Sequence, residues 1–110
     1  MTRSSTIDPE NGGVTLINVY EVEPEKQAEL VALLSDATDT QMRHCKGFVS
    51  VNIHSSLDGS KVINYAQWAT QEDFEAMLKN NDAQAQMKRF AAVAKSVSPA
   101  LYKVNAVHRG

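Results

Sequence analysis

The order in which strand-like and helix-like stretches follow one another constrains the fold of this chain more than any other feature. Runs of β-branched and aromatic residues, or strict alternation of apolar and polar residues, indicate β-strands. Apolar residues spaced three and four apart indicate helices that bury one face. Four strands are predicted in this way, at residues 14–22, 48–55, 61–69 and 101–108.

Helical spacing fills the two intervals that are long enough to hold a helix. The first helix has about five turns and begins at Pro24, a residue suited to the first helical turn. In the second interval Thr70 is placed to cap one helix, and Asp82 to cap a further segment that continues to Ser96. We expect Pro99 to end the helical pattern.

The predicted β-α-β-β-α-β order is that of the ferredoxin-like plait, an α+β fold with both helices on one face of a four-stranded antiparallel sheet. Asp58-Gly59 is a hairpin signal between the two middle strands. Residues 1–13 are polar, so we expect a flexible N-terminal tail followed by one domain over residues 14–110.

Several predicted strands are apolar on both faces. In the first strand Ile17 and Val19 point away from Leu16 and Tyr20, and the third strand mixes apolar residues on its two faces in the same way. A sheet of this kind needs a cover on each side. A second copy packed face to face would supply the second cover, so we expect a two-fold homodimer. The alternative is a monomer with a partly apolar open face.

Composition excludes several classes of function. The 110 residues contain 11 Lys+Arg and 13 Asp+Glu, a net charge of −2, and so lack the positive excess that nucleic acid or an anionic membrane would attract. No apolar run approaches the roughly 20 residues that span a bilayer. The N-terminus has no apolar segment of the kind found in signal peptides. We therefore expect a cytoplasmic protein that binds neither nucleic acid nor membrane.

Familiar metal and cofactor motifs are absent from the sequence. His44, His54 and His108 do not have the spacing of metal ligands, and there is no glycine-rich nucleotide loop. The single cysteine, Cys45, cannot form an internal disulfide and has no evident paired base, so we interpret it as an incidental thiol. No metal, nicotinamide or nucleotide is expected.

The third strand holds the best candidate for a site. Asn64 and Trp68 fall on one face of that strand, about 13 Å apart along it. If that face points toward the helices, an amide and an indole N–H are buried, which is unfavourable unless both find partners. Asn18 on the first strand is a similar candidate. Such groups are either satisfied within the core or kept for a ligand, and the residues alone leave both possibilities open.

Several segments of the chain resemble the antibiotic biosynthesis monooxygenase family. The resemblance covers about residues 14–108 and is carried by residues 17–22, 47–50, 56–59, 64–68 and 74–77. It implies a dimeric α+β barrel. In the branch of the family that oxidises anthrones, it also implies a cofactor-independent monooxygenase, in which a deprotonated, electron-rich phenol, quinol or polyketide-like aromatic itself reacts with O₂.

The same resemblance implies the site residues. Asn64 would hydrogen-bond the oxygen of the substrate, and Trp68 would pack on its ring and offer the indole N–H. Asn18 would assist. Ile53 and Phe74 would form apolar wall where that branch carries tyrosines, so two phenolic hydroxyls are missing.

Two alternatives remain beside this hypothesis. The first is a non-catalytic dimer on the same fold that binds a small molecule or acts in a stress response. The second is a haem-degrading branch of the family, which uses a histidine on its second long helix. Residues 82–96 contain no histidine, which disfavours haem.

Overall fold

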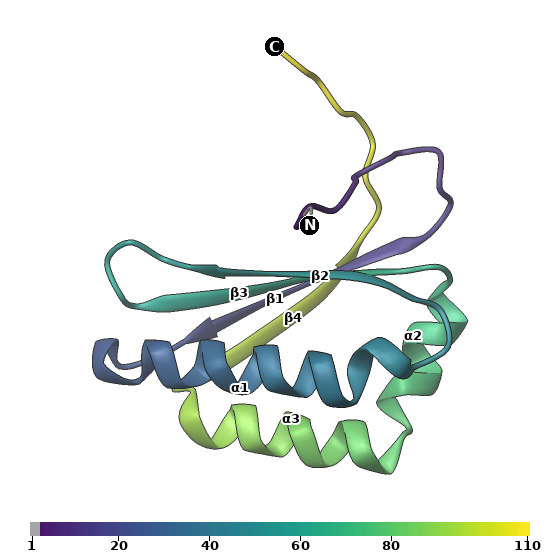
Figure 1. Cartoon of the computed structure of the whole chain (residues 1–110). Helices are drawn as coiled ribbons and strands as arrows, with labels where there is room; N and C mark the ends of the chain where they lie inside the picture. The colour runs from purple at the N-terminus through teal and green to yellow at the C-terminus, as the bar shows by residue number, and fades with distance from the viewer. Residues whose placement is uncertain (1–2) are drawn as a thin grey trace.

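The computed structural model describes residues 3–110 and shows a four-stranded antiparallel sheet with its helices gathered on one face (Figure 1). Residues 1–2 of the expected tail lie outside the described residues. The strand order β2-β3-β1-β4 is that of the ferredoxin-like plait, so the predicted fold is confirmed. The elements are β1 (Val14–Glu21), η1 (Pro24–Lys26), α1 (Gln27–Thr40), η2 (Met42–His44), β2 (Phe48–Ser55), β3 (Lys61–Trp68), α2 (Gln71–Leu78), α3 (Asn81–Val93) and β4 (Ser96–Tyr102).

Side-chain caps fix where the second pair of helices begins. The Thr70 hydroxyl accepts a hydrogen bond from the Asp73 backbone N–H at 3.0 Å, as the sequence predicts. The cap of α3 is Asn80, whose side-chain oxygen accepts from the Ala83 N–H at 3.0 Å. The prediction that Asp82 caps this helix is therefore wrong by two residues. Asp82 instead lies in the first turn, where its negative charge interacts favourably with the positive end of the helix dipole.

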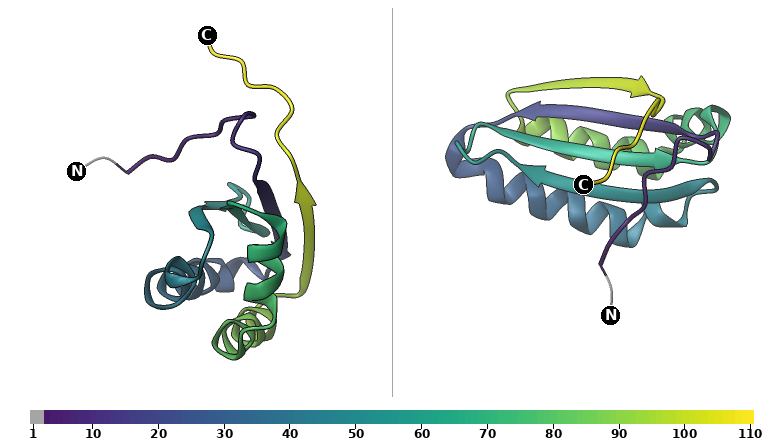
Figure 2. Two further views of the ribbon diagram at one scale, coloured as in Figure 1. Left: turned by 90° about the vertical axis from the view of Figure 1, so that its right-hand side faces the viewer. Right: turned by 90° about the horizontal axis from the view of Figure 1, so that it is seen from above.

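The last strand lies earlier in the chain than the sequence predicts. The expected strand at 101–108 is replaced by β4 (Ser96–Tyr102), and α3 ends at Val93. Pro99 lies inside β4, opposite Asn18 of β1. A proline is tolerated there because β4 is an edge strand, whose second edge has no strand to receive an N–H. Beyond β4 the chain continues away from the sheet to the C-terminus (Figure 2).

A β-bulge shifts the alternation of β2 near its start. Phe48 pairs with Trp68 and Ser50 pairs with Gln67, so Val49 is the extra residue. Simple alternation places Phe48 on the face opposite Val51. The bulge instead brings Phe48 to the helix side with Val51, and it leaves Val49 52% exposed.

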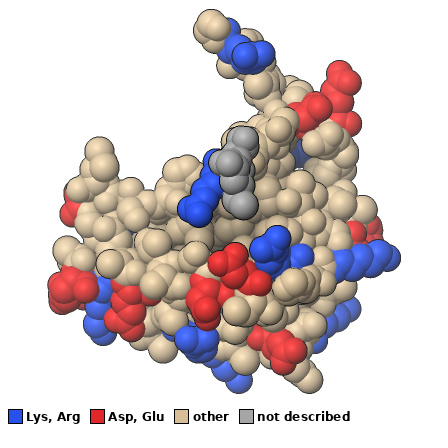
Figure 3. Space-filling view, in the orientation of Figure 1, with Lys and Arg blue, Asp and Glu red and all other residues tan. Residues whose placement is uncertain are grey.

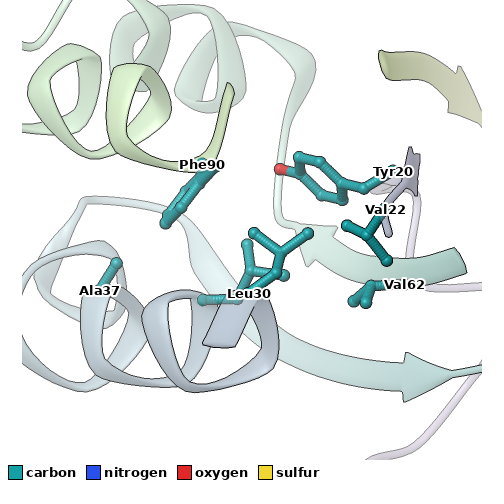
Figure 4. Close-up of a cluster of buried hydrophobic side chains, with 7 residues drawn as sticks. Tyr20, Val22, Leu30, Ala37, Val62 and Phe90 are labelled. Atoms are coloured by element: carbon teal, nitrogen blue, oxygen red, sulfur yellow. The ribbon is translucent and has the colours of Figure 1, made fainter. Parts of the chain in front are cut away.

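Two clusters of buried side chains fill the space between sheet and helices. The first joins β1 and β3 to α1 and α3. Figure 4 labels six of its members, with Leu30 of α1 facing Val62 of β3 and Val22, which follows β1. The second surrounds Trp68 at the other end of the sheet and includes Phe74 and other residues of α2 and α3. Members of both clusters line the cavity described below.

No helix of the described part of the chain covers the opposite face of the sheet (Figure 2). The N-terminal segment lies over part of this face (Figure 2): the Ser5 hydroxyl donates to the Asn52 side-chain oxygen at 3.0 Å, and the Gln67 amide donates to the Thr6 carbonyl at 3.0 Å.

Acidic and basic residues are interspersed over the helical layer (Figure 3). No helix within residues 3–110 has the length and apolar character needed to cross a membrane.

The bulge can be tested with the single tryptophan of the chain as a reporter. We expect Phe48→Ala to shift Trp68 emission to the red and to lower the free energy of unfolding by about 2 kcal/mol, because Phe48 packs edge-on against the indole. Val49→Ala, one residue away, should change stability by less than about 0.5 kcal/mol. Equal effects of the two substitutions would contradict the bulge.

Candidate active site

A cavity of about 720 Å³ lies between the sheet and the helical layer, within the size range of small-molecule sites. Its floor is formed by inward-facing residues of β1 and β3, and its walls by residues of α1, α2, α3 and β4. Leu78, Val97 and Leu101 line the cavity yet stay exposed, so its mouth lies between α2 and β4.

Three buried polar atoms in this cavity have no hydrogen-bond partner among the described residues: the side-chain oxygens of Asn18 and Asn64, and the indole nitrogen Nε1 of Trp68. Asn18 and Asn64 lie directly opposite each other in the pairing of β1 with β3. A buried polar group left without a partner destabilises the folded state by about 1–3 kcal/mol. A ligand bearing hydroxyl and carbonyl oxygens would satisfy all three atoms.

Trp68 is held in place by two aromatic side chains. Its ring meets Phe48 of β2 edge to face, with centroids 5.7 Å apart, and Phe74 of α2 at 6.2 Å. The side chain is 3% exposed. These contacts fix the plane of the indole, so its N–H has a defined direction although it finds no acceptor within the described part of the chain.

Tyr20 is a cavity residue that the sequence analysis did not identify. Its hydroxyl accepts a hydrogen bond from the Asn18 amide nitrogen at 3.1 Å. Burial raises the pKa of Tyr20 to about 12, so the hydroxyl keeps its proton at neutral pH. Strand alternation could have found it, because Tyr20 follows Asn18 by two residues and so shares its face.

Apart from this tyrosine, no residue lining the cavity within the described range 3–110 carries an ionisable side chain. Met42, Met77 and Met87 contribute flexible thioethers to the wall. The site therefore combines hydrogen-bonding groups with apolar surface and contains no carboxylate, imidazole or amine that could act as a general base.

The structure brings four of the five predicted site residues together. Asn18, Asn64, Trp68 and Phe74 all line the cavity. Ile53, predicted as apolar wall, does not: it packs against the cluster around Leu30.

The histidines and the cysteine lie away from the cavity. His44 is in η2, His54 is on the exposed part of β2, and His108 follows β4. Within residues 3–110, no three His, Cys, Asp or Glu side chains converge as metal ligands would. The Gln41 side-chain nitrogen lies 3.4 Å from the Cys45 sulfur, a contact within the loop region that follows α1.

Comparison with known proteins gives a family match. The family model described as "Antibiotic biosynthesis monooxygenase" matches residues 13–92. A curated relative, the tetracenomycin-F1 monooxygenase of Streptomyces glaucescens, is 49% identical over 73 residues, which cover 66% of this chain and 65% of that protein. The match therefore spans just under two thirds of the relative.

Solved structures share the fold. The monooxygenase of the gene ActVA-Orf6 of Streptomyces coelicolor, in complex with nanaomycin D, matches with a TM-score of 0.81 and 22% identity, over 94% of this chain and 96% of that one. SnoaB, a cofactor-independent oxygenase from Streptomyces nogalater, matches with a TM-score of 0.75 and 18% identity, over 87% and 96% of the two chains.

The unpartnered amide oxygen of Asn64 leads to a prediction about stability. Asn64→Leu replaces a buried polar group by an apolar one of similar size, so we expect the free energy of unfolding to rise by about 1 kcal/mol. Asn18→Leu should stabilise less, because it also removes the hydrogen bond to Tyr20. Denaturant unfolding of both variants provides the measurement. Loss of stability in Asn64→Leu would mean that the amide has a partner in the free protein.

Proposed function

Because the chain belongs to the antibiotic biosynthesis monooxygenase family, we propose that it oxidises an electron-rich polycyclic phenol with O₂ and without a bound cofactor. The observation that carries this proposal is the set of three unpartnered polar atoms inside an otherwise apolar cavity of ligand size. Groups kept unsatisfied at the expense of stability are expected where a ligand is bound. The tetracenomycin-F1 relative is likewise a monooxygenase.

The reaction we propose balances without an external reductant. A phenolic substrate with an activated CH₂ group loses a proton, and the resulting carbanion or phenolate transfers electrons to O₂. One oxygen atom forms a new C–O bond and remains as a quinone carbonyl, and the second leaves as water with the two hydrogens of the CH₂ group. The protein would contribute orientation, exclusion of water and stabilisation of the developing negative charge.

The cavity residues suit different parts of this task. The Trp68 N–H is a fixed donor for a substrate oxygen that gains negative charge. The Asn64 amide can accept from a substrate hydroxyl through its buried oxygen and donate through its nitrogen. Phe74 and the three methionines would hold the ring system against the apolar wall. Asn18 would bind a further oxygen beside Asn64.

A non-catalytic binding protein on the same fold remains the second candidate. The lack of an ionisable base in the cavity favours it, because binding alone requires no proton transfer. Oxygen consumption separates the two functions, since only the enzyme converts O₂ in proportion to substrate.

Substitutions at the two proposed catalytic residues test the enzyme. With an anthrone or hydroquinone substrate, we expect oxygen uptake that persists after chelator treatment. Asn64→Ala should lower turnover by about 10²–10³-fold, the usual effect of losing one donor to a developing anion. Trp68→Phe removes the N–H and keeps an aromatic ring, so its turnover should fall less than that of Trp68→Ala. Asn81→Ala, at the exposed start of α3 and away from the cavity, serves as the matched control. Unchanged uptake in Asn64→Ala would exclude this mechanism.

The pH dependence should follow the substrate and not the protein. Among the described residues, Tyr20 is the one ionisable group lining the cavity, and with a pKa of about 12 it stays protonated throughout the working range. The rate should therefore rise with pH around the pKa of each substrate. Two phenols of different acidity should give two different midpoints in initial-rate measurements. A common midpoint for both would instead indicate a base supplied by the protein.

We also propose that the protein works as a homodimer through the face of the sheet opposite the helices. Ile17, Val19, Ile63 and Tyr65 point to that face, where they are only half-buried. An apolar sheet face is stabilised when a further layer buries it. In a two-fold dimer the same face of a second copy supplies that layer.

Light scattering at micromolar concentration tests the dimer. We expect a mass of about twice the 12.1 kDa of one chain. Ile63→Asp should shift the protein toward monomer, because it places a charge in the apolar contact. Glu72→Ala, on the exposed surface of α2, is the control. A wild-type protein that stays monomeric under these conditions would contradict the proposal.

A further inference from the structure

The polar groups of the cavity are spread along the strands and not gathered at one point. Trp68 lies opposite Val14, and Tyr20 lies opposite Val62, so the two side chains are six residues apart along the paired strands. This separation corresponds to about 20 Å at the rise of a β-strand. Asn18 and Asn64 lie between them, directly opposite each other on the two strands. The cavity thus has one polar end at Trp68 and another at Tyr20.

The Tyr20 end presents both a donor and an acceptor. The Tyr20 oxygen accepts from the Asn18 amide nitrogen, and Asn18 is its one hydrogen-bond partner among the described residues. The hydroxyl proton is therefore left to donate. The Asn18 oxygen is buried and accepts from no group in residues 3–110. Together these two atoms match a phenolic hydroxyl, which can accept from Tyr20 and donate to Asn18.

Packing alone does not account for this hydroxyl. The Tyr20 ring meets Phe90 of α3 edge to face, with centroids 6.3 Å apart, and Figure 4 shows its hydroxyl directed into the space between sheet and helices. A phenylalanine would make the same ring contact. The hydroxyl instead adds a buried polar atom whose bonded neighbour, Asn18, is itself a cavity residue.

We propose that Tyr20, positioned by Asn18, is a specificity-determining residue that binds an oxygen substituent on the ring farthest from Trp68. The inference rests on the proposed function and narrows its substrate class. The preferred substrate is a fused-ring aromatic with oxygen substituents on both terminal rings, one toward the Trp68 end and one at the Tyr20 end, with Asn64 between them.

The test combines two ligands with one substitution. The ligands are a hydroxyanthraquinone with one hydroxyl on each outer ring and its analogue with a single hydroxyl. Binding is followed by quenching of the fluorescence of Trp68, the one tryptophan of the chain. We expect the wild-type protein to prefer the doubly hydroxylated ligand by up to about tenfold in Kd, the effect of one hydrogen bond. Tyr20→Phe should show a smaller preference, because it removes the bond from Tyr20 and leaves only the Asn18 oxygen to bind the second hydroxyl.

Tyr102→Phe, an exposed tyrosine of β4, is the matched control and should keep the wild-type preference. Equal affinity of the wild-type protein for both ligands would overturn the inference without any variant. An unchanged preference in a folded Tyr20→Phe protein would overturn it as well. Thermal unfolding of Tyr20→Phe, followed by circular dichroism, establishes that it is folded.

These outcomes are distinguishable from failure of the proposed function. If oxygen uptake depends on Asn64 while Tyr20→Phe keeps the ligand preference, the monooxygenase stands and this role of Tyr20 falls. If the preference weakens in Tyr20→Phe and no substrate supports oxygen uptake, the binding role stands and the catalytic proposal falls.

Discussion

The pairing register of β1 with β3 is the constraint on which the rest of the structure depends. It sets Asn18 opposite Asn64, and it turns Tyr20 and Trp68 to the same side, toward the helices. A slip of one residue would move all four side chains to the other face, because strand side chains alternate. Apolar neighbours such as Leu16 and Val62, buried on the same side, fix this register. The same hydrophobic burial that stabilises the fold thus aligns the polar groups of the cavity.

Much of the fold could be predicted from the sequence because local signals agree with the tertiary structure. The cap at Thr70 and the hairpin at Asp58-Gly59 are local features, and both occur where expected; Gly59 has a φ of +84°, which a glycine adopts without strain. The errors arise where tertiary pairing overrides a local signal. Pro99 ends helices in general, yet here it lies within a strand because that strand is at the edge. The bulge at Val49 depends on pairing with β3 and leaves no mark in simple alternation.

The site was predicted in part for a related reason. Asn18, Asn64 and Trp68 are polar or aromatic groups in apolar strands, which makes them visible in the sequence. Tyr20 has no such contrast, because a tyrosine in a strand is ordinary core material. Ile53 lies on the helix-facing side as expected, but α1 covers its end of the sheet, and the cavity lies farther along. Alternation predicts the face of a strand, whereas the position of a cavity depends on where the helices leave the sheet uncovered.

The place of Pro99 has a consequence for how chains can associate. An edge strand normally offers a row of N–H and C=O groups to which a further strand can add, and repeated addition builds open-ended polymers. Pro99 has no N–H, so the outward row of β4 is interrupted near its centre. Growth of the sheet by lateral strand addition is thereby disfavoured on this side. A closed pair formed through the sheet face, in contrast, requires no edge hydrogen bonds and ends at two copies.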